Sequence, residues 1–483
     1  MARRSVADIM QSGEAESQRM SKTLGPFSIT AMGIGAIIGA GIFVLTGTAA
    51  AHYAGPAIML SFVLGGIACA FVGLCYAELA AMLPVCGSSY TYTYATLGEI
   101  FAWIIGWDLI LEYAMGAATV AVGWSGYITS LLANFGIVIP PELATAPGTP
   151  IHLPNGGAAT GIINLPAVFI VAVLTILLIL GTKDSARLNN IMVAVKLTVV
   201  VAFIGLGAAY VNPAHWHPFL PPNKGAFGEF GVSGILRGSA VVFFAFIGFD
   251  AVSTAAQEAK QPQRDMPIGI LGSLVICTVL YIAVAAVLTG LVPYDQLNVA
   301  DPIAKGVDVI GITWFSVLIK IGALTGLTTV ILVLLYGQTR IFYMMAHDGL
   351  LPGLFSRIHP RLRTPWLSQM LIGVVVAIVA ALVPIAILGE LVSIGTLFAF
   401  VLVCGAVIYL RRTNAGTPRP FRVPAVPWVP ILGILFCLLL MAGLPPVTWL
   451  RLAVWLVIGL VIYFSYGRSH STLRRSGVPE HVS

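Results

Sequence analysis

Apolar runs of about twenty residues recur along the whole chain, separated by short polar or Gly- and Pro-rich stretches. Each run is long enough to cross a hydrocarbon core of about 30 Å as an α-helix. An outer-membrane β-barrel is excluded, because its strands alternate apolar and polar residues. The pattern therefore predicts an all-α, polytopic membrane protein with about twelve transmembrane helices. We expect these helices near 27–51, 56–81, 97–131, 164–181, 188–211, 233–257, 267–291, 315–346, 366–383, 389–410, 428–443 and 448–466.

Composition agrees with a membrane protein. Of 483 residues, 58% are hydrophobic and only 9% are charged, whereas roughly 25% are charged in soluble domains. The six cysteines have no metal-ligand spacing and are expected to be small buried hydrophobes. His215 and His217 lack further ligands in sequence, so we expect no metal and no cofactor. The net charge of +6 comes from scattered basic residues, so nucleic acid is not an expected partner.

The basic residues predict the orientation. If the N-terminus is cytoplasmic, nineteen of the 25 Lys and Arg fall on the cytoplasmic side. The positive-inside rule then predicts that both termini are cytoplasmic, in the cell membrane. The predicted parts are an N-terminal tail (1–26), helices one to five (27–211), helices six to ten (233–410), helices eleven and twelve (428–466) and a C-terminal tail (467–483). Residues 134–161 are expected to form an external loop.

Two of the predicted helices carry signs of a break. The first contains four glycines between residues 33 and 43, a density that weakens a helix, and a break is expected near 39–41. The second, five spans later, places Asp250 close to Gly248 inside the membrane. Because five is an odd number, the two helices cross the bilayer in opposite directions. This predicts two inverted five-helix repeats, 27–211 and 233–410, with a binding site at their breaks.

The chemistry of two broken helices indicates the ligand. Free N–H groups around 39–41, at the start of the second half-helix, suit a carboxylate. Free carbonyl groups around 244–247 suit an ammonium. A ligand with both groups is an α-amino acid. The alternative is that Gly35 and Gly39 only form a small-residue packing face, as in many membrane helices.

Four charged residues are predicted to lie within spans, where each costs roughly 2.5 kcal/mol or more unless it has a partner. Glu112, which shares a helix face with Asp108, is either a counter-charge for a basic substrate or a structural hydrogen-bonding group. Lys196 is a candidate for proton coupling together with Asp250. The alternative for Lys196 is a permanent ion pair with Asp250. Lys320, near the outer end of its helix, is expected to snorkel.

These residues lie in motifs that resemble the amino acid-polyamine-organocation superfamily, most closely its cationic amino acid transporter branch. The motifs are GIGAIIGAGIF (33–43), CYAE (75–78), GWDLILEY (106–113), GFDAV (248–252), PQRDMP (262–267), YGQTR (336–340) and IGTL (394–397). The resemblance covers nearly the whole chain. It implies a five-plus-five inverted-repeat transporter fold with broken helices 1 and 6, and alternating access to a site for L-amino acids.

The resemblance also implies roles for individual residues. The glutamate matching Glu112 faces the site in that family, and the lysine matching Lys196 stands where sodium binds in sodium-coupled relatives. Secondary active transport driven by protons is therefore expected. The predicted substrate-binding residues are Ile37, Gly39, Ala40, Gly41, Glu112, Phe244, Ala245 and Ile247, and the predicted proton-coupling residues are Lys196 and Asp250.

The sequence leaves more than one substrate class and more than one activity open. Glu112 favours arginine or lysine as substrate, whereas the bulky Leu334 and Leu335 favour alanine-sized ligands, and the sequence leaves both open. A multi-span enzyme would need a nucleophile or a His/Asp constellation, and a channel or sensor would use the same fold without coupled flux. The expected partners are an L-amino acid, the proton and the lipid bilayer.

Overall fold

The computed structural model describes residues 24–83, 88–152, 158–181, 185–414 and 416–475. Most of the predicted N-terminal tail, Cys86 and residues 476–483 of the predicted C-terminal tail lie outside this part. Within the described ranges, eight segments are long and apolar enough to cross a membrane, and four shorter apolar helices accompany them. The prediction of a helical, polytopic membrane protein is therefore confirmed, whereas the division into two inverted repeats stays a prediction.

Each predicted span coincides with a helix of the structure. The corresponding helices are α2 (Pro26–Ile37), α4 (Ile58–Met82), α6 (Glu99–Asn134), α7 (Leu165–Leu180), α8 (Ser185–Ala208), α9 (Gly231–Val242), α10 (Pro262–Leu291), α12 (Thr313–His347), α13 (Trp366–Leu382), α14 (Ile385–Thr413), α15 (Trp428–Gly443) and α16 (Pro446–Ile462). Shorter helices are α3 (Thr46–Ala49), α5 (Ser88–Thr96), α11 (Pro302–Ile310), α17 (Arg468–His470) and α18 (Thr472–Arg475).

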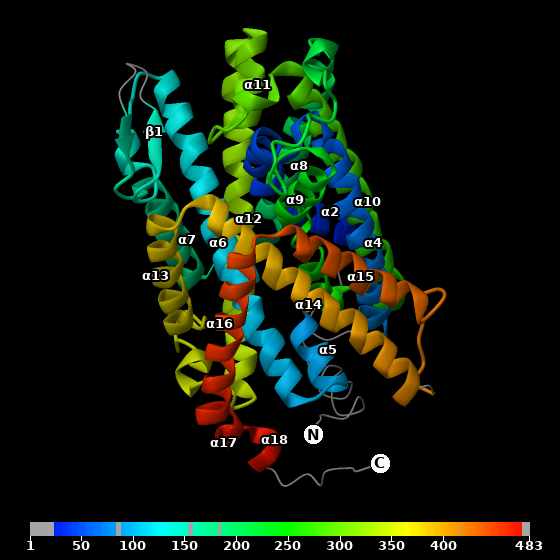
Figure 1. Ribbon diagram of the computed structural model, residues 1–483. Coiled ribbons are helices and arrows are strands. Elements are labelled where there is room, and N and C mark those ends of the chain that lie inside the picture. The colour runs from blue at the N-terminus through cyan, green and yellow to red at the C-terminus, as the bar shows by residue number, and fades with distance from the viewer. Residues whose placement is uncertain (1–23, 84–87, 153–157, 182–184, 415, 476–483) are drawn as a thin grey trace.

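The long helices pack into one bundle (Figure 1). Helix α12 packs along α6, α10 packs against both α2 and α4, and α13 lies beside α7 on one flank. Helices α14 and α15 cross obliquely on the other side of the bundle. Helix α11 lies at one end of the molecule, and α5, α17 and α18 lie at the opposite end. The two broken segments described below lie within this bundle.

The first predicted span is broken close to the expected position. Helix α2 ends at Ile37, and Ile38 has extended backbone with φ −72° and ψ 103°. A π-helical turn, Gly41–Leu45, then begins the second half of the span. The break at Ile38 and Gly39 thus begins one residue before the predicted stretch 39–41, and it still falls within the glycine-rich run.

The second break lies in the sixth span. Helix α9 ends at Val242 and continues as a 3-10 turn, Phe243–Phe246. Ile247 is extended, and Gly248 has a φ of +112°, which L side chains rarely adopt. A second 3-10 segment, Asp250–Glu258, follows. The predicted interruption therefore spans Ile247 and Gly248.

Two details differ from the expectations. The nitrogen Nζ of Lys320 donates to Oδ1 of Asn134 at 3.0 Å, and Lys320 is only 2% exposed. The prediction that Lys320 snorkels is wrong, because a neighbouring helix end supplies its acceptor. The expected loop 134–161 contains part of an antiparallel hairpin, β1 (Pro150–His152) paired with β2 (Ala158–Thr160).

Candidate functional site

The two broken segments lie directly against each other. A Cβ atom at Gly41 would fall 2.2 Å from the Cα of Ala245, so only glycine allows this approach. A Cβ atom at Gly248 would fall 2.8 Å from the carbonyl oxygen of Ala36. The glycines in the two breaks therefore bring unwound backbone from two distant parts of the sequence into contact.

The first break leaves backbone donors without acceptors. In the described part of the chain, the N–H groups of Gly39, Ala40 and Gly41 make no hydrogen bond. Gly39 lines a cavity and Ala40 is fully buried, so water does not surround this stretch. Unpaired buried backbone groups are destabilising unless they face a ligand or water. This stretch can bind a carboxylate.

A small cavity lies between the two breaks. Its volume is about 20 Å³, which is room for about one water molecule. Its walls come from both breaks and from α6 and α12. The lining residues are Ala36, Ile37, Gly39, Ala40, Gly116, Phe244, Ile247, Val330 and Leu334. An amino acid does not fit into this volume, so the structure shows a closed state in which the site must expand to admit a ligand.

Tyr281 on α10 joins the two breaks. Its hydroxyl oxygen lies 2.9 Å from the carbonyl oxygen of Ile37 and 2.8 Å from that of Ala245. The hydroxyl carries one proton, so it donates to one of these carbonyl groups at a time. The other carbonyl oxygen is then available for a cationic donor such as an ammonium.

Lys196 lies on the other side of the first break. Its Nζ donates to the carbonyl oxygen of Gly35, to that of Ile38 at 3.1 Å, and to Oγ1 of Thr329 on α12 at 3.5 Å. The side chain is fully buried. The alternative of a permanent ion pair between Lys196 and Asp250 is wrong, because carbonyl groups freed by the break serve as acceptors.

Three buried carboxyl groups form a separate cluster. The side chains of Glu112, Asp250 and Asp108 lie near enough to one another for their charges to interact. Tyr113 donates to Oδ2 of Asp250 at 3.4 Å. Each of these carboxyl groups is at most 1% exposed. Neighbouring carboxylates in such surroundings repel each other.

The predicted site residues thus lie in four places. Ile37, Gly39, Ala40, Phe244 and Ile247 line the cavity. Gly41 and Ala245 form the contact between the two breaks. Glu112 and Asp250 belong to the carboxyl cluster, and Lys196 holds the end of α2.

Sequence reasoning did not assign five residues to the site: Ala36, Gly116, Tyr281, Thr329 and Val330. Tyr281 and Val330 lie in ordinary apolar helical runs, and Gly116 is one of many helical glycines, so the sequence carries only weak signals for them. Leu334 lines the cavity as expected, whereas Leu335 is not part of its wall.

Comparison with known proteins agrees with this architecture. A family model described as amino acid permease matches residues 24–464. The chain belongs to the amino acid permease family. The permease is 49% identical over 474 residues to the branched-chain amino acid permease BcaP of Bacillus subtilis, with 98% of each chain covered.

Other relatives of the permease carry different names. It is 46% identical to the methylthioribose transporter of Bacillus subtilis, with 96% of this chain and 97% of that one covered. It is 33% identical to the vacuolar cationic amino acid transporter 4 of Arabidopsis thaliana, with 95% and 94% covered. The resemblance to the superfamily and its cationic branch is thereby confirmed. The permease is a multi-pass membrane transporter and not an enzyme.

Proposed function

We propose that the permease is a proton-coupled carrier of L-amino acids with aliphatic side chains. The observation that carries this proposal is the pair of breaks in contact at Gly41 and Ala245, with unpaired N–H groups beside an apolar cavity. The N–H groups of residues 39–41 bind the substrate carboxylate, and the carbonyl groups of the second break bind its ammonium. The small cavity expands to hold the side chain of the substrate.

The lining of the cavity favours an apolar substrate side chain. Val330, Leu334 and Phe244 offer no hydrogen-bond partner to a guanidinium or ammonium group. Glu112, the counter-charge expected for arginine or lysine, is not part of the lining. The name of the relative BcaP, branched-chain amino acid permease, supports valine, leucine and isoleucine as the first substrates to test.

The buried charges support proton coupling. Lys196 occupies the space at the end of α2 with its ammonium group. Loss of one proton would leave two N–H donors for the three acceptors that Nζ contacts, and without the positive charge its bonds to the carbonyl groups of Gly35 and Ile38 would weaken. The neighbouring pair Glu112 and Asp250 offers a second place to hold a proton. We assign the coupling step to these three residues.

The proposed location is the cytoplasmic membrane, with both termini in the cytoplasm. The supporting observation is the distribution of basic residues over the loops. The loop between α12 and α13 carries Arg357, Arg361 and Arg363, and the segment after α14 carries Arg419 and Arg422.

Uptake into proteoliposomes tests the proposal. Radiolabelled leucine is expected to accumulate under an inward proton gradient, with excess unlabelled valine and isoleucine competing better than alanine, arginine or methylthioribose. Accumulation of arginine or methylthioribose but not leucine would reject the proposed substrate class. Leucine flux that equilibrates without accumulation would reject proton coupling.

A variant of Glu112 separates its two roles. If Glu112 shares a proton with Asp250, Glu112→Gln is expected to reduce the gradient-driven accumulation of leucine. If Glu112 is instead the counter-charge for a basic substrate, the same change weakens binding of arginine and lysine and leaves leucine accumulation intact. Competition binding and uptake on the same preparation distinguish the two outcomes.

A further inference from the structure

A second, larger cavity lies on the outside of the bundle. It is a groove of about 750 Å³ between the first half of α10 and the loop that joins α14 to α15. On α10, its wall includes Ile268, Val275 and Ile276, which are 44%, 63% and 40% exposed. Pro420 and Phe421 form the wall opposite. The groove is mostly apolar and open on the surface of a membrane protein, so bilayer lipid can reach it.

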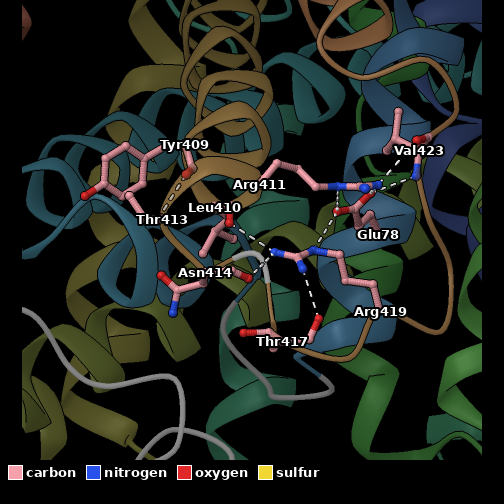
Figure 2. A network of polar contacts seen from close by, with 9 residues as sticks. All are labelled: Glu78, Tyr409, Leu410, Arg411, Thr413, Asn414, Thr417, Arg419 and Val423. Atoms are coloured by element: carbon pink, nitrogen blue, oxygen red, sulfur yellow. Dashed lines mark hydrogen bonds and ion pairs between the residues drawn. The ribbon is translucent and has the colours of Figure 1, made fainter.

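The loop wall of this groove is held rigidly. Arg411 donates to both carboxylate oxygens of Glu78, at 2.8 and 2.7 Å, and the N–H of Val423 donates to Oε2 of Glu78 at 2.7 Å. Nε of Arg419 lies 3.3 Å from Oε1 of Glu78. Figure 2 shows both arginines converging on this one carboxylate. Since these contacts bracket Pro420 and Phe421 in the chain, they fix that wall in place.

Among the side chains that the structure describes, the charge at the groove is positive and has no acidic partner. Arg264 lines the groove and is exposed to the surface. Within the described residues, no acidic side chain forms an ion pair with Arg264. The neighbouring acid, Asp265, is buried and accepts from the N–H of Gln261 at 3.0 Å. Arg422, directly after Phe421, is also exposed. The acid of the loop network, Glu78, already pairs with Arg411 and Arg419.

We propose that this groove binds a phospholipid with an anionic headgroup. The acyl chains lie along Ile268, Val275 and Ile276, and the phosphate meets Arg264. The volume falls within the range of small-molecule sites, and a basic residue beside a membrane surface attracts anionic lipid by about 1 kcal/mol. A free phosphate would contact the same arginine but would leave the apolar walls uncovered. The proposal rests on the membrane location of the chain and not on its substrate.

Native mass spectrometry of the purified protein in detergent tests this site. The probes are phosphatidylglycerol and phosphatidylcholine with identical acyl chains. One phosphatidylglycerol is expected to bind with a dissociation constant about five-fold lower than that of phosphatidylcholine. Arg264→Gln is expected to abolish this preference, and Val275→Trp, which fills the groove, is expected to weaken binding of both lipids.

A matched control keeps the test specific. Arg361→Gln removes another exposed arginine, from the loop between α12 and α13, and is expected to retain the preference for phosphatidylglycerol. Excess glycerol phosphate is expected not to displace the lipid. Equal binding of both lipids by the unmodified protein, an unchanged preference in Arg264→Gln, or displacement by glycerol phosphate would each overturn the proposal. All three variants change exposed side chains, and melting curves check that they fold.

Discussion

At the scale of single residues, Lys196 and Tyr281 bind the same short stretch of backbone from two sides. Lys196 donates to the carbonyl groups of Gly35 and Ile38, and Tyr281 is shared between those of Ile37 and Ala245. A broken helix frees such carbonyl groups, which are unfavourable in apolar surroundings unless they find donors. These two side chains therefore stabilise the break, and a change in either alters the conformation of the site.

Replacement of Lys196 tests its assignment to coupling. Lys196→Met keeps most of the side-chain volume and removes the ammonium group, so no proton can be released at the end of α2. We expect uptake of leucine into proteoliposomes to become independent of the proton gradient. Lys320→Met, which removes a buried lysine held by Asn134 instead, is expected to keep the gradient response. A variant of Lys196 with a normal response to the gradient would remove this residue from the coupling mechanism.

Loss of the Tyr281 hydroxyl is expected to weaken substrate binding. In Tyr281→Phe the carbonyl groups of Ile37 and Ala245 lose their shared donor, which destabilises the fold by about 1 kcal/mol. Because the two breaks are then less well held, we expect the dissociation constant for leucine to rise about tenfold. Scintillation proximity binding measures this change. Tyr336→Phe, which removes an exposed hydroxyl bound by Arg340, serves as control, and equal effects of both changes would contradict the role of Tyr281.

At the scale of elements, the contact between the two broken segments depends on the absence of a side chain at Gly41. The Cβ of an alanine there would meet the backbone of Ala245 at 2.2 Å, which a rotamer change cannot relieve. Gly41→Ala is therefore expected to separate the breaks and abolish leucine uptake. Gly205→Ala in α8 adds the same methyl group where nothing lies within 4 Å and is expected to retain uptake. Active Gly41→Ala protein would show that the breaks need not touch.

The sequence predicts elements better than it predicts contacts. Glycine weakens a helix locally, so the break in the first span is visible in residues 33–43. The partners of Lys196 cannot be read from the sequence, because Gly35 and Thr329 lie 161 and 133 residues away from it along the chain. A buried charge predicts that a partner exists, but it does not predict which group that partner is. Every residue has a backbone carbonyl group, so the sequence does not mark the ones that act as acceptors. For this reason the sequence leaves Asp250 open as a partner of Lys196, and the structure replaces it with backbone carbonyl groups.

At the scale of the whole molecule, the closed cavity implies a cycle of opening. A volume of about 20 Å³ holds no amino acid, so substrate must enter and leave through other conformations. The groups that hold the breaks are Lys196 on α8 and Tyr281 on α10, and Thr329 on α12 accepts from Lys196. All three helices are long and extend beyond the site. We therefore expect release of Lys196 or Tyr281 from the breaks to let these helices shift.

Opening of the site is measurable with a cysteine in the cavity wall. Val330 is only 5% exposed, and Val330→Cys changes little in volume. We expect a charged thiol reagent to modify this cysteine slowly in proteoliposomes, because the reagent reaches it only in open conformations, and we expect leucine to slow the reaction by filling the cavity. Val376 is fully buried in α13 and is not part of the cavity lining, so Val376→Cys is expected to stay unmodified. The unaltered protein measures the background reaction of the native cysteines. If Val330→Cys transports leucine yet never reacts, the path of the substrate does not pass between the two breaks.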